Sequence, residues 1–237
     1  MTKKMAIMEI FGPTIQGEGM MIGQKTMFVR TGGCDYSCKW CDSAFTWNGT
    51  EKATMMTAEE VYNKLIEMAA GNFTHVTISG GNPALIGEPM REFVDLCHEH
   101  NIKVGLETQG SRWQNWMWDI DELTISPKPP SSGMHTKWQT LDDIIIRLRD
   151  HVNFSLKVVI FNGEDYQYAK VVHTTYPDVP FYLSVGNEDP YESGDISRRL
   201  LDQLEWLWNL VLHDPEMNDV RVLPQLHTLV WANKRAV

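Results

Sequence analysis

Three of the four cysteines in this 237-residue chain fall within eight consecutive positions. They are Cys34, Cys38 and Cys41, in a C-x3-C-x2-C spacing. Thiols crowded on so short a loop are typical of metal ligation in a reducing compartment, where disulfides are rare. Three thiolates can bind three irons of a cubane cluster and leave the fourth iron open, and an open position is where chemistry takes place. The spacing therefore predicts a 4Fe–4S cluster with one open iron.

Two other interpretations of the three cysteines are a structural zinc site and incidental thiols. Zinc needs a fourth ligand at close spacing, and no Cys or His follows Cys41 before His75. A four-cysteine ferredoxin cluster needs another cysteine nearby, and the next one is Cys97. Cys97 lies alone in a helical stretch, where we expect a small buried hydrophobic residue.

Further candidate segments lie where expected strands end. They are GGNP at 80–83, ETQG at 107–110 and SPK at 126–128. Ahead of the first clear strand, the segment 11–19 is expected to be a glycine-rich loop that offers the side chains of Gln16 and Glu18.

Short runs rich in β-branched residues alternate with amphipathic helical runs along the chain. A helix is expected to begin at Thr57 with a capping box to Glu60, to bury Val61, Leu65 and Met68, and to stop near residue 71. Other apolar stripes at helical spacing occupy 141–148 and 196–211. The expected strands span 25–30, 75–79, 102–108, 123–126, 154–161, 181–185 and 220–223.

This alternation predicts an α/β fold with a mostly parallel sheet and outer helices. With six or seven strands, the pattern alone allows an open, partial β/α barrel or a doubly wound sheet. In both folds the site is built at the carboxyl ends of the strands. No repeat, low-complexity segment or linker divides the chain, so we expect a single domain over residues 1–237.

The composition points to a globular protein with a small-molecule substrate. Hydrophobic residues make up 43% of the chain, which excludes a disordered protein. The 21 Lys and Arg against 31 Asp and Glu give a net charge of −10, which argues against a nucleic-acid partner. No apolar run has the length of a membrane span and no signal peptide is evident, so we expect no membrane partner and a cytoplasmic location.

The cysteine motif, with Trp40 just before its last cysteine, resembles the signature of the radical S-adenosylmethionine (SAM) superfamily. The resemblance implies a full or partial β/α barrel whose open iron is chelated by SAM. One electron from the cluster then cleaves SAM to methionine and a 5′-deoxyadenosyl radical, which abstracts hydrogen from the substrate. The segment 80–83 resembles the superfamily's GGE motif, which holds the methionine amino group, with Asn82 in place of the usual Glu.

A longer set of motifs resembles the 7-carboxy-7-deazaguanine synthase family of the queuosine pathway. The motifs are FGPTIQGEG at 11–19, FVR at 28–30, CDYSCKWCDS at 34–43, SGGNP at 79–83, ETQG at 107–110, ISPKPPS at 125–131 and PQLHTLVWANKRAV at 224–237. This resemblance implies a lyase that contracts the ring of 6-carboxy-5,6,7,8-tetrahydropterin with loss of ammonia. SAM is regenerated in that reaction, and Mg2+ binds beside the substrate carboxylate.

The same resemblance implies roles for individual residues. The substrate would contact Ile15, Gln16, Gly17, Arg30 and Ser79. SAM would be lined by Trp40, Cys41, Asp42, Gly81, Ser126, Pro127 and Lys128. Metal ligands would be Cys34, Cys38 and Cys41 for the cluster and Ser43 for Mg2+. For Arg30 the alternative is an ordinary ion pair. Glu107 and His227 are placed only in the neighbourhood of the site, and a structural role for His227 is an equal alternative.

Two other functions compete with a synthase. One is a radical SAM activase that acts on a partner protein, which would lack the 11–19 motif. The other is a non-catalytic iron–sulfur or zinc scaffold. The family resemblance further implies a homodimer and a flavodoxin or ferredoxin as electron donor.

Overall fold

One curved sheet organises the part of the chain that the computed structural model describes, residues 3–151 and 153–237. Its strands follow the order β3-β1-β2-β4-β5-β6-β7-β8-β9. They are β1 (Met5–Ile15), β2 (Lys25–Thr31), β3 (Thr54–Met56), β4 (His75–Gly80), β5 (Lys103–Thr108), β6 (Glu122–Ile125), β7 (Phe154–Ile160), β8 (Phe181–Val185) and β9 (Arg221–Leu223). From β2 to β9 every neighbouring pair is parallel, while β1 runs antiparallel to β2 and β3. The sheet is the open β/α barrel predicted from the sequence.

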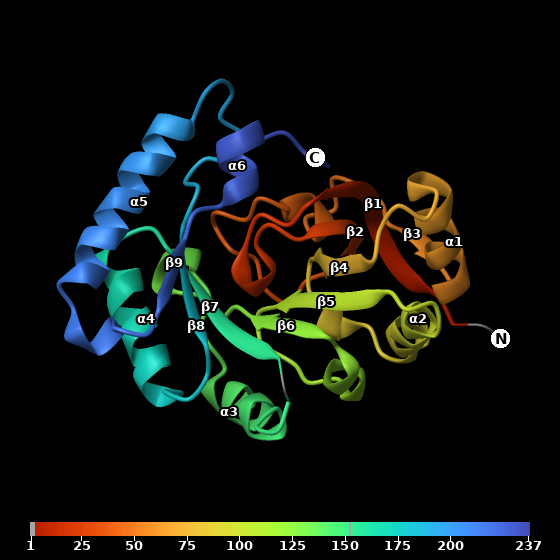
Figure 1. Cartoon of the computed structure of the whole chain (residues 1–237), viewed down its shortest axis with the longest axis horizontal. Helices are drawn as coiled ribbons and strands as arrows, with labels where there is room; N and C mark the ends of the chain where they lie inside the picture. The colour runs from red at the N-terminus through yellow and green to blue at the C-terminus, as the bar shows by residue number, and fades with distance from the viewer. Residues whose placement is uncertain (1–2, 152) are drawn as a thin grey trace.

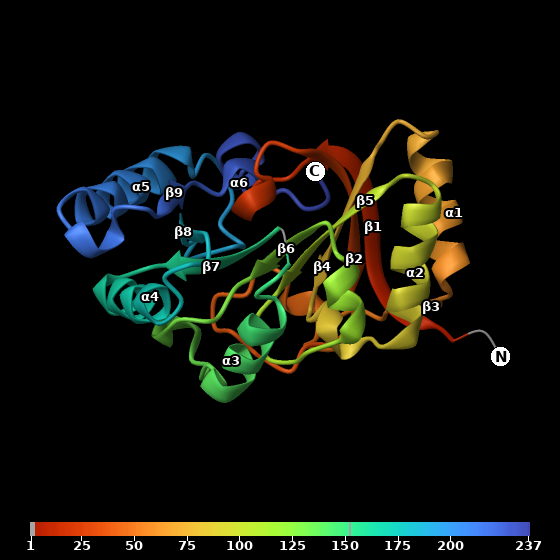
Figure 2. The same cartoon turned by 60° about the horizontal axis from the view of Figure 1, so that its bottom comes forward.

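Six α-helices lie around this sheet in the described residues, and all but the last cover its outer side. They are α1 (Ala58–Ala69), α2 (Glu88–Glu99), α3 (Trp138–Arg147), α4 (Gly163–Thr175), α5 (Ser197–Leu212) and α6 (Leu226–Trp231). Helices α1 and α2 flank one end of the sheet, and α4 and α5 flank the other (Figures 1 and 2). The short helix α6 lies beside the loops above the carboxyl ends of the strands (Figure 1). None of the described helices is long and apolar enough to cross a membrane.

Helix α1 illustrates how local sequence and packing define an element. The capping box is present, because Thr57 accepts a hydrogen bond from the Glu60 amide at 3.1 Å and its own amide donates to the Glu60 carboxylate at 2.7 Å. Val61 and Leu65 are fully buried, as predicted. Met68 is 40% exposed, so its predicted burial is wrong. The spacing of four residues continues the buried face to Ala69 instead.

The seven expected strands are present within two residues of their predicted ends. Strands β1 and β3 were not predicted, so the sheet has nine described strands and not six or seven. Residues 11–15, expected in a loop, form the end of β1. The Gly12-Pro13 pair made this strand hard to predict, because glycine and proline usually indicate a turn. In the structure the pair lies at a register shift between Phe11 and Thr14, where a strand tolerates proline.

Strand β7 is buried along its whole length, as expected for a parallel strand covered on both sides. Lys157 lies in the middle of this strand and its side chain is 1% exposed. A buried ammonium group requires charged partners. This lysine therefore indicates an electrostatic centre inside the barrel.

Candidate active site

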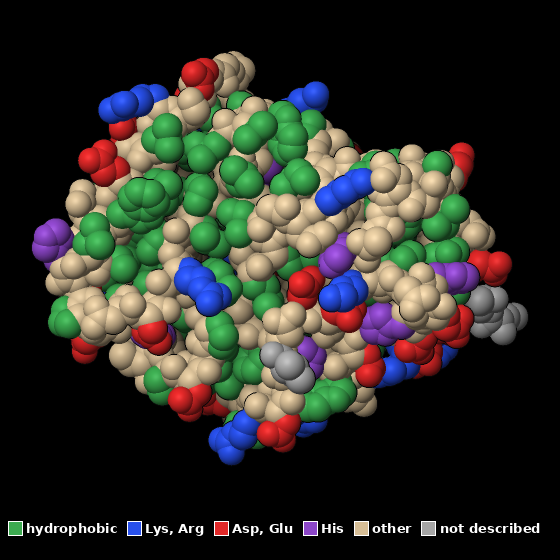
Figure 3. Space-filling model, in the orientation of Figure 1, with side chains coloured by type: hydrophobic (Ala, Val, Ile, Leu, Met, Phe, Trp, Pro, Cys, Tyr) green, Lys and Arg blue, Asp and Glu red, His purple; other side chains and the backbone are tan. Residues whose placement is uncertain are grey.

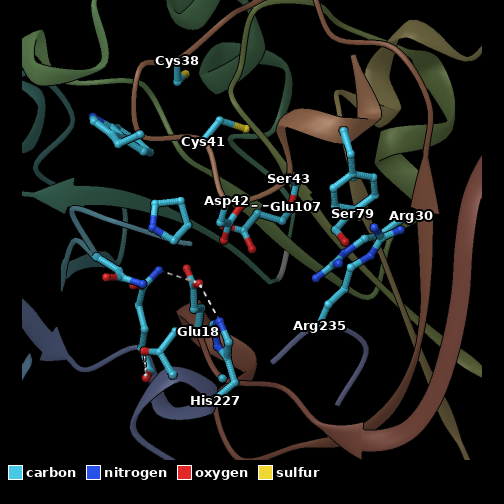
Figure 4. Close-up of a pocket in the computed structure, with 18 of the residues that line it drawn as sticks. Glu18, Arg30, Cys38, Cys41, Asp42, Ser43, Ser79, Glu107, His227 and Arg235 are labelled. Atoms are coloured by element: carbon cyan, nitrogen blue, oxygen red, sulfur yellow. Dashed lines mark hydrogen bonds and ion pairs between the residues drawn. The ribbon is translucent and has the colours of Figure 1, made fainter. Parts of the chain in front are cut away.

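A cavity of about 600 Å³ opens at the carboxyl ends of the strands. It is lined by residues of β1, β2, β4, β5 and β7, by the segment after β6, by the cysteine loop, and by α6 with the segment after it. All the residues predicted for the site line this cavity except Pro127. Glu107 and His227 line it as well. Figure 4 shows how these side chains converge from distant parts of the chain.

The cysteine loop is fixed by close backbone packing. A Cβ atom at Gly81 would collide with the carbonyl oxygen of Gly33, so the two glycines let the loop after β4 press against the start of the cysteine loop. On its other side, the Lys39 amide donates to the Ser132 carbonyl at 3.0 Å, and the Tyr36 hydroxyl donates to the His135 carbonyl at 3.0 Å. The loop is therefore held between β4 and the segment after β6.

The three thiols are suited to a cluster. The amide of Tyr36 and the side chain of Gln109 donate to the Cys34 sulfur at 3.4 and 3.5 Å, and the indole N–H of Trp47 donates to the Cys41 sulfur at 3.5 Å. Such N–H···S bonds stabilise cluster thiolates. Burial is the main cause that raises the pKa of Cys38, to about 11. The metal-free thiols are therefore protonated near neutral pH, and binding of iron must release their protons.

The spacing of the sulfurs argues against zinc. A single tetrahedral zinc ion with bonds of about 2.3 Å holds its sulfurs about 3.8 Å apart. Within the described residues, the group of three potential ligands whose atoms all lie within 4.8 Å of one another is Glu18, Asp42 and His227, and the three cysteines do not form such a group. Cys97 is fully buried in α2, within the core, as predicted.

Asn82 does not line the cavity. It is fully buried, and its amide nitrogen donates to Asp35 at 2.8 Å and to Ser111 at 3.0 Å. Its amide oxygen accepts from the Thr108 hydroxyl at 2.8 Å and from the Ala84 amide at 3.2 Å. The residue that stands in place of the usual Glu thus connects the cysteine loop with the end of β5.

Lys157 forms a buried ionic triad with two carboxylates. Its ammonium group lies 2.6 Å from Glu18 and in direct contact with Glu107. The Glu18 carboxylate also accepts from Gln225 at 2.9 Å, and His227 lies 3.9 Å away. Two carboxylates and one ammonium leave the triad with one net negative charge at the cavity wall.

Burial would by itself raise the pKa of Glu18. The charges of Lys157 and His227, with hydrogen bonds from Lys157 and Gln225, outweigh this effect and lower the pKa to about 2. Burial likewise opposes the charge of Lys157, but Glu107 and Glu18 together raise its pKa above the usual range. Glu18 and Lys157 are therefore both charged at neutral pH.

The loop after β1 is shaped around His227. A Cβ atom at Gly17 would collide with the imidazole of His227, so glycine is needed where this loop meets α6. The Gln16 side chain is buried, and its oxygen accepts from the Gly17 amide at 2.7 Å. The predicted substrate loop therefore has a fixed shape that depends on α6.

Arg30 lies near the end of β2 and is 21% exposed. It pairs with Glu9 at 2.8 Å, as the ion-pair alternative expected, and it also lines the cavity. Its guanidinium lies 4.9 Å from the ring centroid of Phe11, which stacks on Phe28 at 4.8 Å. Ser79 is paired with Arg30 across the parallel strands β2 and β4.

Comparisons with known proteins agree with this geometry. The model of the radical SAM superfamily matches residues 28–172. A 7-carboxy-7-deazaguanine synthase of Bacillus subtilis is 57% identical over 100% of both chains, and one of Bacillus cereus is 53% identical over 99% of both. The chain belongs to the 7-carboxy-7-deazaguanine synthase family of radical SAM enzymes. The crystal structure of QueE from Escherichia coli has the same fold, with a TM-score of 0.69 at 20% identity over 94% of this chain and 95% of that one.

As a member of this synthase family, the chain is a radical SAM enzyme of the lyase type that uses a 4Fe–4S cluster and SAM. The alternatives of a protein activase and a non-catalytic scaffold find no support in these relatives.

Sequence reasoning assigned no role to several residues of the synthase cavity. They are Lys157, Gln225, Arg235 and the aromatic residues Phe11, Phe28 and Phe45. One signal was available for Lys157, because a charged residue inside an otherwise apolar strand seldom lacks a function. Gln225 and Arg235 carry no comparable signal, because their partners lie more than 180 residues away in the sequence.

Proposed function

We propose that this enzyme converts 6-carboxy-5,6,7,8-tetrahydropterin into 7-carboxy-7-deazaguanine and ammonia, a step towards queuosine. The observation that carries the proposal is one cavity that combines the three-cysteine loop, a buried anionic triad and an arginine with N–H groups that no acceptor among the described residues occupies. The whole of residues 1–237 would act as one domain. Anaerobic reconstitution with iron and sulfide, followed by incubation with SAM, Mg2+, reductant and this pterin, tests it. Formation of a deazapurine chromophore is expected, and its absence with a loaded cluster would contradict the proposal.

Cys34, Cys38 and Cys41 would hold the cluster, which with SAM supplies the radical that removes one hydrogen atom from the substrate. The residues proposed to line SAM lie in the cysteine loop or directly after β4 and β6. They are Trp40, Cys41, Asp42, Gly81, Ser126 and Lys128. Trp40 is fixed by a hydrogen bond from its indole N–H to Ser131 at 3.0 Å and by packing on Phe161 at 4.8 Å. Lys128 adds a positive charge 5.9 Å from the Trp40 ring, suited to the SAM carboxylate. Pro127 is not a lining residue and would only shape the backbone.

Ile15, Gln16 and Gly17, with Arg30 and Ser79, would bind the pterin. Arg30 suits the substrate carboxylate because its planar fork can make two parallel hydrogen bonds to it. The triad carboxylates would accept hydrogen bonds from the N–H groups of the ring. Both features favour a ligand with one anionic end and one N–H-rich end.

An Arg30→Lys variant tests the carboxylate contact, since lysine keeps the charge and loses the fork. We expect turnover efficiency with the pterin to fall by about ten- to a hundredfold, the cost of one charge-assisted hydrogen bond. Cluster content and SAM affinity serve as controls and should not change. Unchanged pterin affinity and turnover would rule out this contact.

Mg2+ would bind at Ser43, beside the substrate carboxylate. The Ser43 hydroxyl lines the cavity and donates to the exposed carboxylate of Asp42 at 2.9 Å. The ligand atoms of Glu18 and His227 lie within 4.8 Å of that of Asp42. Hydroxyl and carboxylate oxygens suit a hard cation.

The enzyme would form a homodimer. Helix α5 buries one apolar face and exposes a second, with Leu201, Trp208 and Leu212 at helical spacing. Figure 3 shows apolar side chains gathered over this helix. A contiguous exposed apolar surface of this kind is typical of an interface. Light scattering of the wild type and of Trp208→Glu, which should be monomeric, tests this proposal.

The electron donor would be a flavodoxin or ferredoxin, and the location cytoplasmic. Lys39, between two cluster cysteines, is exposed and gives a docking donor protein a charged contact close to the cluster. None of the four cysteines forms a disulfide in the described structure, which suits a reducing compartment.

A further inference from the structure

Glu9 connects two arginines from opposite ends of the sequence. It lies opposite Arg30 in the antiparallel pair β1–β2. One carboxylate oxygen of Glu9 accepts from Arg30 at 2.8 Å, and the other accepts from the Nε–H of Arg235 at 2.7 Å. The Glu9 side chain is largely buried, with 14% exposure. Figure 4 shows Arg30 and Arg235 side by side at one end of the cavity.

Arg235 is held from three directions. Besides its bond to Glu9, its two terminal nitrogens donate to the two oxygens of Glu51 at 2.6 and 3.0 Å. Its guanidinium also lies 3.6 Å from the ring centroid of Phe45. The same ring lies 5.9 Å from the guanidinium of Arg30. Arg235 is therefore fixed by two carboxylates, Glu9 and Glu51, and by the ring of Phe45.

Arg30 differs from Arg235 in how many of its guanidinium N–H groups already donate to protein acceptors. A guanidinium carries five N–H donors. Among the described residues, Glu9 is the hydrogen-bond acceptor of Arg30 and takes one donor, on Nη1. The remaining donors are available to a ligand in the cavity that Arg30 lines.

We propose that Arg235 is a positioning residue for substrate recognition. It fixes Glu9, and Glu9 holds one edge of Arg30 so that the other edge faces the substrate carboxylate. The segment 232–237 thereby completes the carboxylate-binding end of the cavity. This inference rests on the proposed function, in which Arg30 binds that carboxylate.

The role of Arg235 predicts a particular selectivity. Without Arg235, Glu9 is free to turn towards Arg30 and to occupy a second of its donors, in competition with the ligand carboxylate. Binding of a carboxylated pterin should weaken, while binding of a pterin without the carboxylate should not. A residue that only anchored the 232–237 segment would affect both ligands equally.

The test is a double-mutant cycle in the reconstituted holoenzyme with SAM, using Arg235→Gln, Arg30→Lys and the double variant. Dissociation constants for 6-carboxypterin and for unsubstituted pterin are measured by quenching of tryptophan fluorescence, and KM and kcat with the tetrahydropterin substrate. Arg147→Gln is the matched control, because Arg147 forms an exposed ion pair with Asp143 on α3.

We expect Arg235→Gln to weaken 6-carboxypterin binding and to raise KM by about tenfold, with kcat within about twofold of the wild type and pterin binding unchanged. In the Arg30→Lys background the same change should have little further effect, because Arg235 acts through Arg30. Equal weakening of both ligands, or an undiminished effect in that background, would overturn the inference. A wild type that converts the substrate but binds both pterins equally would refute the Arg30 assignment and this inference together. A wild type that prefers 6-carboxypterin but yields no deazapurine would refute the proposed function alone.

Discussion

Replacing Lys157 by methionine tests whether the buried triad is an electrostatic unit. Methionine has nearly the length of lysine and fits an apolar strand, so the main change is the loss of the ammonium group. Glu18 and Glu107 would then face each other inside the barrel without a cation between them. The variant should be less stable than the wild type at neutral pH.

The size of the loss can be worked out from Glu18. Its pKa falls from 4.5 to about 2 in the folded enzyme. A shift of about 2.5 units corresponds to about 3 kcal/mol of stability at neutral pH. Lys157 is one of the groups that cause the shift, together with His227 and Gln225. Its removal also leaves two carboxylates uncompensated, for which a loss of roughly 3–5 kcal/mol is expected.

The loss should depend on pH in a defined direction. In the wild type, the lowered pKa of Glu18 contributes stability that is present above 4.5 and is lost as the pH falls towards about 2. In Lys157→Met, burial without a cation raises the pKa of a triad carboxylate above its usual value. Protonation then relieves the repulsion, so the variant recovers relative to the wild type as the pH falls.

Urea unfolding under anaerobic conditions at about pH 8 and about pH 5.5 measures both effects. The difference between the two proteins should be largest at the higher pH. Lys64→Met is the control, because Lys64 forms an exposed ion pair with Glu67 and its loss should cost less than about 1 kcal/mol. The reasoning fails if Lys157→Met is as stable as this control at about pH 8, or if its deficit is the same at both pH values.

Three further predictions test individual side chains. Alanine in place of Cys34, Cys38 or Cys41 should abolish SAM cleavage, because an iron of the cluster loses its protein ligand. The Cys97→Ala variant should keep its iron, and loss of iron from this variant would refute the ligand assignment. Ser43→Ala should need more Mg2+ for turnover at unchanged SAM affinity, and overlapping Mg2+ titrations would exclude the contact. Asn82→Ala leaves several buried polar groups without their hydrogen bonds and should lower the free energy of unfolding, measured by urea denaturation, by about 2–4 kcal/mol. A decrease of less than about 0.5 kcal/mol would contradict the structural role of Asn82.

Features carried by contiguous residues could be predicted from the sequence. The cysteine loop and the segments at the strand ends fall at the carboxyl edge of a parallel sheet, where chain order alone brings them together. The triad could not be predicted, because Glu18 and Lys157 are 139 residues apart and no spacing pattern pairs them. The bond between Glu9 and Arg235 spans 226 residues and depends on the 232–237 segment reaching back to β1.

The cavity has an unequal distribution of charge that would orient the substrate. Arg30 lies at one end, Glu18 with His227 lies at another, and the cysteine sulfurs lie above both (Figure 4). A ligand with one carboxylate and an N–H-rich ring edge can satisfy Arg30 and Glu18 together in one orientation, since the reverse orientation places like charges in contact. In the proposed substrate the carboxylate is attached to the carbon that loses hydrogen. A side chain that holds the carboxylate therefore also fixes the reacting carbon relative to the cluster.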